Sequence, residues 1–480
     1  MPRKLWQNEM IRIFKHYIAR WSLLLLAMET LIFIASIYGG VAIRFLDQAH
    51  PDEMHSGGLF PRALFFAVVM ILSMTAMGRY QHLMENGQAG EILGILLSFV
   101  VGIVAMSLLF YVFPHLFIGR GAFGYTLLLA LMGVMLNRAL FVKFVLDMDL
   151  LRRRILVVGA GEQARFLENA LQQQSVKEHR IIGFLPIPGE LEWVSAEKVL
   201  RGSTLNEVVK TQGVHLVVLT DVDILPRELM EQMLDCKMRG VRTVDLLGFF
   251  EQADRVIRMD LLDPQWWIFH SDGLERNLLQ ELSKKFFDVV VSLFLIGITW
   301  PLMLLAVLAI WVDSGFRGPV FYTQQRVGYG GRVFKVVKFR SMHTDAEGAG
   351  PQWAQRNDRR ITRVGHVLRQ TRIDELPQFF NVLKGEMSLV GPRPERPEFV
   401  EILAGRIPYY RERLRVKPGI TGWAQICYGY GASVEDAVEK LYYDLYYVKN
   451  QGLFFDLLVL IHSVEVVLFG RGATGPRRLE

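Results

Sequence analysis

Cysteine is nearly absent from this chain of 480 residues, which contains only Cys236 and Cys427. Neither belongs to a CxxC pair or to a cluster with histidine, so the sequence predicts no disulfide framework and no structural zinc site. We expect both thiols to be ordinary buried side chains. The sequence also has no internal repeat and no long low-complexity segment.

Charged residues are scarce in four long apolar runs, at 22–43, 59–78, 92–113 and 123–145. Each run is close to the ~20 residues that cross a bilayer. Glu29 and Arg138 fall within these runs, away from their ends, and we expect them to pair or to face the bundle interior. Two such residues are too few for a lipid-linked sugar transporter. With 51% hydrophobic residues and a mean hydropathy of +0.25, the composition is that of a membrane protein.

The charges beside these runs predict their orientation. Basic residues precede the first run and follow the fourth, whereas acidic residues lie in the first loop, so both ends of the four-helix transmembrane region should face the cytoplasm. No convincing small-residue cleavage site follows the first run, which argues against a cleavable signal peptide. The sequence therefore predicts a multi-pass membrane protein.

The next segment has the pattern of a Rossmann-like domain but lacks one of its functional residues. A short strand runs into the turn Gly159-Ala160-Gly161 and then into a helix, and 181–185 and 216–219 form further strands. The second strand is followed by Pro186 and not by the acidic residue that holds a ribose. Gly159 and Gly161 are candidate cofactor-binding residues, although structural or regulatory use is favoured. A membrane-tethered nucleotide-sugar oxidoreductase or epimerase is the alternative function, and Gly159→Ala should spare a function located elsewhere.

A fifth apolar run, at 286–312, contains Pro301 at its middle. A full crossing would place the basic region that follows outside the cell, where nucleotide sugars are scarce. Because proline kinks a helix, we favour a re-entrant helix that returns to the same face. An ordinary kinked span is the alternative.

The strongest candidate for chemistry is the pair Asp374-Glu375. Asp374 is predicted to cap a helix whose first turn contains Pro377, and Gly385 is predicted to end it. The apolar face of this helix is predicted to consist of Leu376, Phe379, Phe380 and Leu383. A helix N-terminus favours an ionised Asp374 and a bound phosphate. Asp374 is thus a candidate nucleophile and Glu375 a candidate ligand for Mg²⁺. The alternative is that both carboxylates merely suit the helix N-terminus.

Basic residues are concentrated around this pair. Residues 317–417 contain twenty Lys or Arg against ten Asp or Glu, a net charge of +10, whereas the whole chain is +6. This excess suits phosphate esters or an anionic membrane surface, while nucleic acid is excluded by the membrane spans and by the lack of a reading motif. Arg411, Arg413 and Arg415 alternate at strand-like spacing, and they are either functional or a solvated edge.

From residue 284 onward, the chain resembles the bacterial sugar transferase family, the monotopic polyprenyl-phosphate phosphoglycosyl transferases. The matching residues are Gln325-Arg326-Val327-Gly328, Lys338-Phe339-Arg340-Ser341-Met342, Asn357-Asp358-Arg359-Arg360-Ile361-Thr362, Asp374-Glu375-Leu376-Pro377-Gln378, Asn381-Val382-Leu383-Lys384-Gly385, Ser388-Leu389-Val390-Gly391-Pro392-Arg393-Pro394 and Lys417-Pro418-Gly419-Ile420-Thr421-Gly422. The resemblance implies a protein of the bacterial inner membrane. One departure is Trp300-Pro301, where the family usually has Ser-Pro.

The resemblance implies transfer of a sugar 1-phosphate, with glucose or galactose favoured, from a UDP-sugar to undecaprenyl phosphate, releasing UMP. It would be the first step of exopolysaccharide or O-antigen synthesis. Asp374 would form the covalent intermediate, and Glu375 would help to hold Mg²⁺. The implied substrate-binding residues are Lys338, Arg340, Arg360, Arg369 and Arg393.

The sequence therefore predicts a multi-domain membrane protein with a possible homodimer interface in its amino-terminal part. The expected domains are a four-helix transmembrane region (1–150), a Rossmann-like α/β domain (151–250), a linker (251–283), a re-entrant membrane helix (284–312) and a cytoplasmic α/β catalytic domain (313–480).

Overall fold

The computed structural model describes residues 10–13, 16–45, 58–80, 87–141, 143, 153–173, 179–221, 225–262, 278–344, 358, 360–429 and 433–469. The chain forms two compact units, and the main boundary between them lies at Ala253 and Asp254.

Four apolar helices of the first unit pack around a shared core. They are α1 (Arg20–Arg44), α2 (Leu59–Ala76), α3 (Gly87–Val112) and α4 (Arg120–Phe141), preceded by the paired strands β1 (Met10–Ile13) and β2 (His16–Ala19). The rings of Phe33, Phe66 and Phe99 meet in this core, where Phe33 contacts both others. All four helices are long and apolar enough to cross a membrane, as the hydropathy of the sequence predicted.

Glu29 and Arg138, the two charged residues that the sequence analysis singled out in these helices, form an ion pair. The Arg138 Nε donates to Glu29 Oε1 at 2.7 Å, and the Tyr80 hydroxyl donates to the other oxygen of the same carboxylate at 2.5 Å. Glu91 also pairs with Arg138. Glu29 is fully buried, and Arg138 compensates its charge inside the bundle, as expected.

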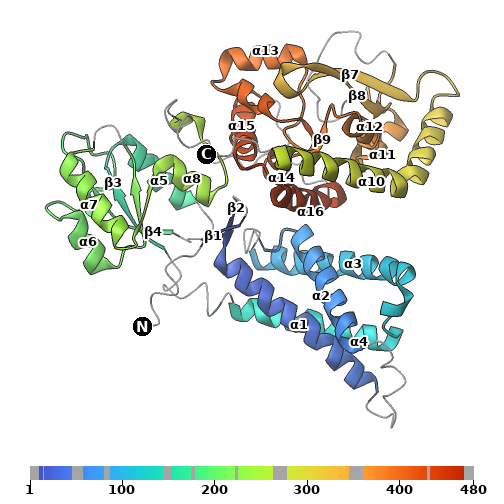
Figure 1. Cartoon of the computed structure of the whole chain (residues 1–480), viewed down its shortest axis with the longest axis horizontal. Helices are drawn as coiled ribbons and strands as arrows, with labels where there is room; N and C mark the ends of the chain where they lie inside the picture. Colours follow the sequence, from blue (N-terminus) through green and yellow to red (C-terminus); the bar gives the residue numbers. More distant parts are fainter. Residues whose placement is uncertain are drawn as a thin grey trace. The chain divides into compact units, whose positions relative to one another are not determined.

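A four-stranded parallel sheet forms the α/β part of the first unit (Figure 1). Its strands, in the order β4-β3-β5-β6, are β4 (His179–Leu185), β3 (Arg153–Val158), β5 (Leu216–Leu219) and β6 (Arg242–Asp245). The flanking helices are α5 (Glu162–Gln173), α6 (Leu205–Gln212), α7 (Arg227–Met238) and α8 (Leu246–Ala253). The sequence did not predict β6, because this edge strand is only half buried and has no apolar run.

The second unit has an α/β arrangement that begins with a long apolar helix. Its helices are α10 (Leu278–Asp313), α11 (Arg363–Gln370), α12 (Gln378–Leu383), α13 (Pro397–Arg406), α14 (Trp423–Cys427), α15 (Val434–Asn450) and α16 (Leu453–Phe469). An antiparallel pair joins β7 (Phe321–Val327) to β8 (Val333–Phe339), and a parallel pair joins β9 (Ser388–Val390) to β10 (Gly419–Thr421).

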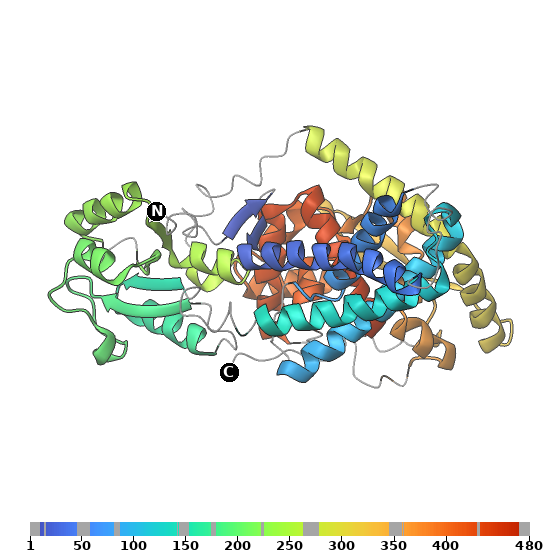
Figure 2. The same cartoon turned by 90° about the horizontal axis from the view of Figure 1, so that it is seen from below.

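Helix α10 bends near its middle in both views (Figures 1 and 2) and contains Pro301. Proline cannot donate to the carbonyl four residues earlier, which here belongs to Gly297. In place of the serine that the family has before this proline, Trp300 is 58% exposed. Thr299 supplies a hydroxyl one residue earlier, and it donates to the Leu295 carbonyl at 2.7 Å.

The two cysteines differ in their surroundings. Cys236 is buried in the core between α6 and α7, as expected. The expectation was wrong for Cys427, which is partly exposed at the end of the short helix α14.

Candidate active site

The carboxylate pair enters the interior of the second unit after Arg372, a residue with left-handed backbone angles. Helix α11 ends at Gln370, and Arg372 then adopts φ +59° and ψ 14°. Positive φ is uncommon for a residue with a side chain and concentrates at functional sites. The reversal leads into the 3-10 turn η8 (Ile373–Glu375), where Asp374 is 7% exposed and Glu375 is 8% exposed.

The predicted N-cap at Asp374 was wrong. Asp374 lies inside η8 and makes no capping hydrogen bond, and α12 begins only at Gln378, after Pro377. The apolar face was wrong in part, because Phe379 and Val382 are buried whereas Phe380 is 43% exposed. The helix does end before Gly385, which has φ +80° as a left-handed terminator should.

Glu375 is the anion at the centre of a cationic cluster. Its Oε1 accepts hydrogen bonds from Lys338 Nζ and from Arg393 Nη2, both at 2.9 Å, and lies 3.8 Å from Arg372 Nη1. Burial alone would raise the pKa of Glu375, but Lys338, Arg393 and Arg372 outweigh it and lower the pKa well below its usual value. Burial also lowers the pKa of Lys338.

Asp374 differs from its neighbour in both contacts and charge. Its Oδ1 is buried and accepts no hydrogen bond from any described residue. Burial, and after it the charge of Glu375, raises the pKa of Asp374 to about 6, although Lys338, Arg369 and Arg372 act in the opposite direction. An oxygen that is desolvated and unpartnered keeps its lone pairs available for a reacting atom.

The remaining predicted cations divide into two groups. Lys338 and Arg393 belong to the first group, because both donate hydrogen bonds to Glu375. Arg369 joins them through its positive charge, which lowers the pKa of Asp374. Arg340 donates to the Arg317 carbonyl at 3.4 Å, and the Arg360 guanidinium makes two hydrogen bonds to Asp358, at 2.8 and 2.6 Å.

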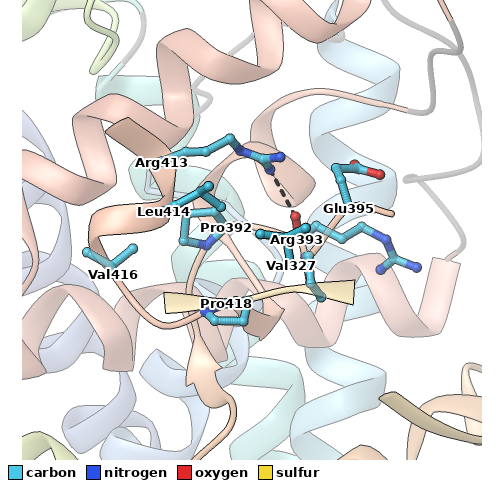
Figure 3. Close-up of a pocket in the computed structure, with 10 residues that line it drawn as sticks. Val327, Pro392, Arg393, Glu395, Arg413, Leu414, Val416 and Pro418 are labelled. Atoms are coloured by element: carbon cyan, nitrogen blue, oxygen red, sulfur yellow. Dashed lines mark hydrogen bonds between the residues drawn. The ribbon is translucent and has the colours of Figure 1, made fainter. Parts of the chain in front are cut away.

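Three further residues support this site, and the sequence assigned a role in it to none of them. Arg372 precedes the pair directly, so its position was the available signal. Asn381 bridges α12 to β8: its Oδ1 accepts from Val337 N at 3.1 Å, and its Nδ2 donates to the Lys335 carbonyl at 2.8 Å. Arg413 lies in the 3-10 turn η9 (Tyr410–Arg415), so its strand-like spacing was misleading. It is buried, and its Nη2 donates to the Arg393 carbonyl (Figure 3).

The donor set for a metal consists of the two adjacent carboxylates. Among the residues that the structure describes, no cluster of three or more His, Cys, Asp or Glu side chains is placed to hold a metal ion. Mg²⁺ is commonly bound through one or two carboxylates together with substrate phosphates. The pair therefore fits a Mg²⁺ ion that arrives with, or is completed by, a phosphate ligand.

In the parallel-sheet part of the first unit, the glycine turn is occupied by a side chain of the protein itself. Glu190 Oε2 accepts from Ala160 N and Oε1 from Gly161 N, both at 2.8 Å. Pro188 and Gly189, the latter with φ +87°, form the turn that brings Glu190 there. This carboxylate occupies the backbone donors that would otherwise face a phosphate.

We expect Glu190→Ala to lower the melting temperature, because it leaves two backbone donors without their acceptor, at a cost of about 1–3 kcal/mol. Added phosphate should restore part of the loss. Glu192→Ala, which breaks a pair with the exposed Arg201, is the control. Tight NAD binding that is the same with and without Glu190 would contradict this interpretation. Gly159→Ala is a poor probe of this turn for two reasons. A Cβ at position 159 would lie 1.9 Å from Thr220 Oγ1, and Gly159 has φ +115°, which strains a residue with a side chain.

The fold and the site define a class of protein: a membrane-embedded α/β protein whose buried carboxylate pair is surrounded by cations suited to an anionic phosphate ligand. A sequence model of the bacterial sugar transferase family matches residues 279–470. The chain is 30% identical over 366 residues to an undecaprenyl-phosphate galactose phosphotransferase of Salmonella typhimurium, covering 72% of this chain and 74% of that one. The chain belongs to the bacterial sugar transferase family.

Two other relatives are matched over a smaller share of their length. A UDP-N-acetylgalactosamine-undecaprenyl-phosphate N-acetylgalactosaminephosphotransferase of Aeromonas hydrophila is 47% identical over 190 residues, 40% of this chain and 44% of that one. An undecaprenyl-phosphate glucose phosphotransferase of Komagataeibacter xylinus is 33% identical over 341 residues, 67% of this chain and 60% of that one. The chain thus spans less than two thirds of both proteins.

Proposed function

We propose that this protein transfers a sugar 1-phosphate from a UDP-sugar to undecaprenyl phosphate and releases UMP, as the first step in the synthesis of an exopolysaccharide or O-antigen. The observation that carries the proposal is the contrast within the carboxylate pair. Asp374 has a buried oxygen without a hydrogen-bond partner, whereas Glu375 is held by Lys338 and Arg393. The relatives' names supply the substrate class.

The reaction has two displacements at one phosphorus atom. An Asp374 carboxylate oxygen attacks the β-phosphorus of the UDP-sugar, and the bond to the bridging oxygen breaks, so that UMP leaves with that oxygen. An oxygen of undecaprenyl phosphate then attacks the same phosphorus and breaks its bond to Asp374. Neither step requires a general base, because both nucleophiles are already anions.

The cations make these displacements possible by neutralising the anions that meet in the site. Lys338 and Arg393 hold Glu375 beside the nucleophile, and Arg369 and Arg372 add positive charge around Asp374. Preorganised charge of this kind stabilises phosphoryl-transfer transition states. Asp374 and Glu375 would hold Mg²⁺, which when bound supplies further neutralisation of the diphosphate.

We infer that α10 is re-entrant, because both of its halves dock on the same unit. On the first half, Lys284 Nζ lies 2.6 Å from Asp456, and Asp288 accepts from Ser388 Oγ at 3.1 Å. On the second half, Ala306 and Ile310 pack in a cluster with side chains of β8 and α11. A straight α-helix from 288 to 310 is roughly 33 Å long, about a hydrocarbon core, so a crossing would separate its ends by the membrane.

The residues between these docking points suit a membrane. Phe294, Ile298 and Leu305 are about 60% exposed, with values of 64%, 59% and 61%. A bent helix that exposes apolar side chains while both ends dock on one domain would sit in one leaflet, and the catalytic domain would remain at the cytoplasmic surface of the inner membrane. An insoluble lipid phosphate and a soluble nucleotide sugar meet at that surface.

We propose the domain order that the sequence predicts: a transmembrane region, a Rossmann-like domain, a re-entrant helix and a catalytic domain. The oxidoreductase alternative is disfavoured, because the relatives' names describe sugar-phosphate transfer and Glu190 occupies the donors of the glycine turn.

The proposal is tested by UMP release from the protein in nanodiscs with undecaprenyl phosphate and Mg²⁺. The donors are UDP-glucose, UDP-galactose and UDP-N-acetylgalactosamine, since the relatives' names include all three sugars. We expect one donor to give repeated turnover only when the lipid is present, and at most one UMP per protein molecule without it. Repeated UMP release that is independent of the lipid, or no release with any UDP-sugar, would contradict the proposal.

A further inference from the structure

The buried Arg413 joins three elements of the second unit through one guanidinium group. Its Nε donates to Asp444 Oδ2 on α15 at 3.0 Å, and its Nη2 lies 2.8 Å from the same oxygen. Its Nη1 donates to the Tyr410 hydroxyl at 2.9 Å, and Nη2 also donates to the Arg393 carbonyl at 2.9 Å. Arg413 is 7% exposed and Asp444 is 2% exposed, so this charge pair is almost fully desolvated.

The segment that carries Arg393 is held at three consecutive carbonyl groups. The Arg393 carbonyl accepts from Arg413 at 2.9 Å, and the Pro394 carbonyl accepts from Arg326 Nη1 at 3.0 Å. The Glu395 carbonyl accepts from the backbone of Val327 at 2.9 Å. The direction in which the Arg393 side chain leaves the backbone is therefore set by groups outside the carboxylate pair.

Figure 3 shows the Arg413 guanidinium aimed at the Arg393 carbonyl, while the Arg393 side chain extends away from it. The cavity beside this contact has a volume of about 10 Å³, which is only near the limit for one water molecule. Such close packing leaves the segment little room to shift while the hydrogen bond is present.

We propose that Arg413, compensated by Asp444, is a positioning residue that holds the Arg393 backbone so that the Arg393 guanidinium meets Glu375. Its effect on catalysis rests on the proposed transfer reaction. Asp444 keeps the guanidinium buried, because a buried cation without its anion is strongly disfavoured and turns towards water. When the guanidinium turns away, the Arg393 carbonyl loses its donor, and the contact between Arg393 and Glu375 loosens.

The first test is a double-mutant cycle on the full-length protein in nanodiscs. We expect Asp444→Asn to lower the rate of UMP release about 10-fold, but less than about 2-fold when Arg393→Ala is already present, because both changes act on one contact. Tyr410→Phe, which removes a single acceptor of Arg413, should give a smaller loss with the same non-additivity if Asp444→Asn fails to fold. Arg411 lies on the same turn as Arg413 and forms an exposed pair with Glu401. Arg411→Gln breaks this pair and is the control, for which we expect an unchanged rate.

The second test does not depend on the reaction. Hydrogen exchange measured by mass spectrometry should become faster in Asp444→Asn in peptides covering residues 391–396, and should be unchanged in α12. Faster exchange throughout the second unit, or additive losses in the cycle, would overturn the positioning role and leave a general structural pair. If the wild-type protein releases no UMP, the proposed function fails, and the exchange experiment alone decides this inference.

Discussion

Asp374→Asn is expected to abolish sugar-phosphate transfer while raising the melting temperature. The amide has no anionic oxygen to form the covalent intermediate, so transfer should fall by at least about 10³-fold. The fold should gain stability, since burial and Glu375 raise the pKa of Asp374 from 3.8 to about 6. A shift of this size corresponds to a cost on the order of 2–3 kcal/mol for keeping the carboxylate ionised at neutral pH.

The pH dependence gives this prediction a second measurement. Between the unfolded value of 3.8 and the folded value of about 6, the native state binds more protons, so the destabilisation by Asp374 is relieved as the pH falls through about 6. The difference in melting temperature between wild type and Asp374→Asn should therefore shrink below pH 6. Over the same interval the wild-type transfer rate should fall, because the nucleophile becomes protonated.

Two measurements identify the intermediate directly. Wild-type protein incubated with a radiolabelled UDP-sugar, without the lipid, should retain label that is released by undecaprenyl phosphate. Asp374→Asn should retain none. Full turnover by this variant would rule out Asp374 as the nucleophile, and a fall in melting temperature would show that its charge is satisfied in the native state.

Glu375→Gln should have the opposite effect on stability and the same effect on activity. Lys338, Arg393 and Arg372 lower the pKa of Glu375, so its ionised form stabilises the fold. Removing that anion leaves Lys338, whose side chain is 22% exposed, without the carboxylate that lies 2.9 Å from its Nζ. Breaking a buried charge pair typically costs about 3–5 kcal/mol, and we expect the lower part of this range because the cations are partly exposed.

Two measurements test the prediction for Glu375→Gln: the pH dependence of its stability and the effect of a second substitution at Lys338. The stabilisation by Glu375 is present above its unfolded pKa, near 4.5, and is lost as the pH falls through the lower folded value, so the penalty of Glu375→Gln should disappear in acid. Adding Lys338→Met should recover part of the melting temperature but none of the transfer. A Glu375→Gln protein as stable as wild type at pH 7 would show that the pairing with Lys338 and Arg393 contributes nothing to the fold.

The sequence determined those features that depend on neighbouring residues and on composition. The four apolar helices and the strand at 216–219 lie where hydropathy placed them, because an uninterrupted apolar run of a given length has few structural outcomes. The pair Asp374-Glu375 was found for a similar reason, since its neighbours along the chain carry the family motif. Local pattern failed at Asp374 itself, where the left-handed Arg372 replaces a helix cap by a 3-10 turn.

The two adjacent carboxylates differ in pKa and in hydrogen bonding, and this difference arises only from the tertiary structure. Lys338 and Arg393 come from other elements, and their contacts hold Glu375 ionised while Asp374 is buried with an unpartnered oxygen. The same holds for Glu190, which reaches the glycine turn from 29 residues further along the chain. Electrostatic effects on a group depend on distance and desolvation in space, and neither quantity can be read from spacing along the sequence.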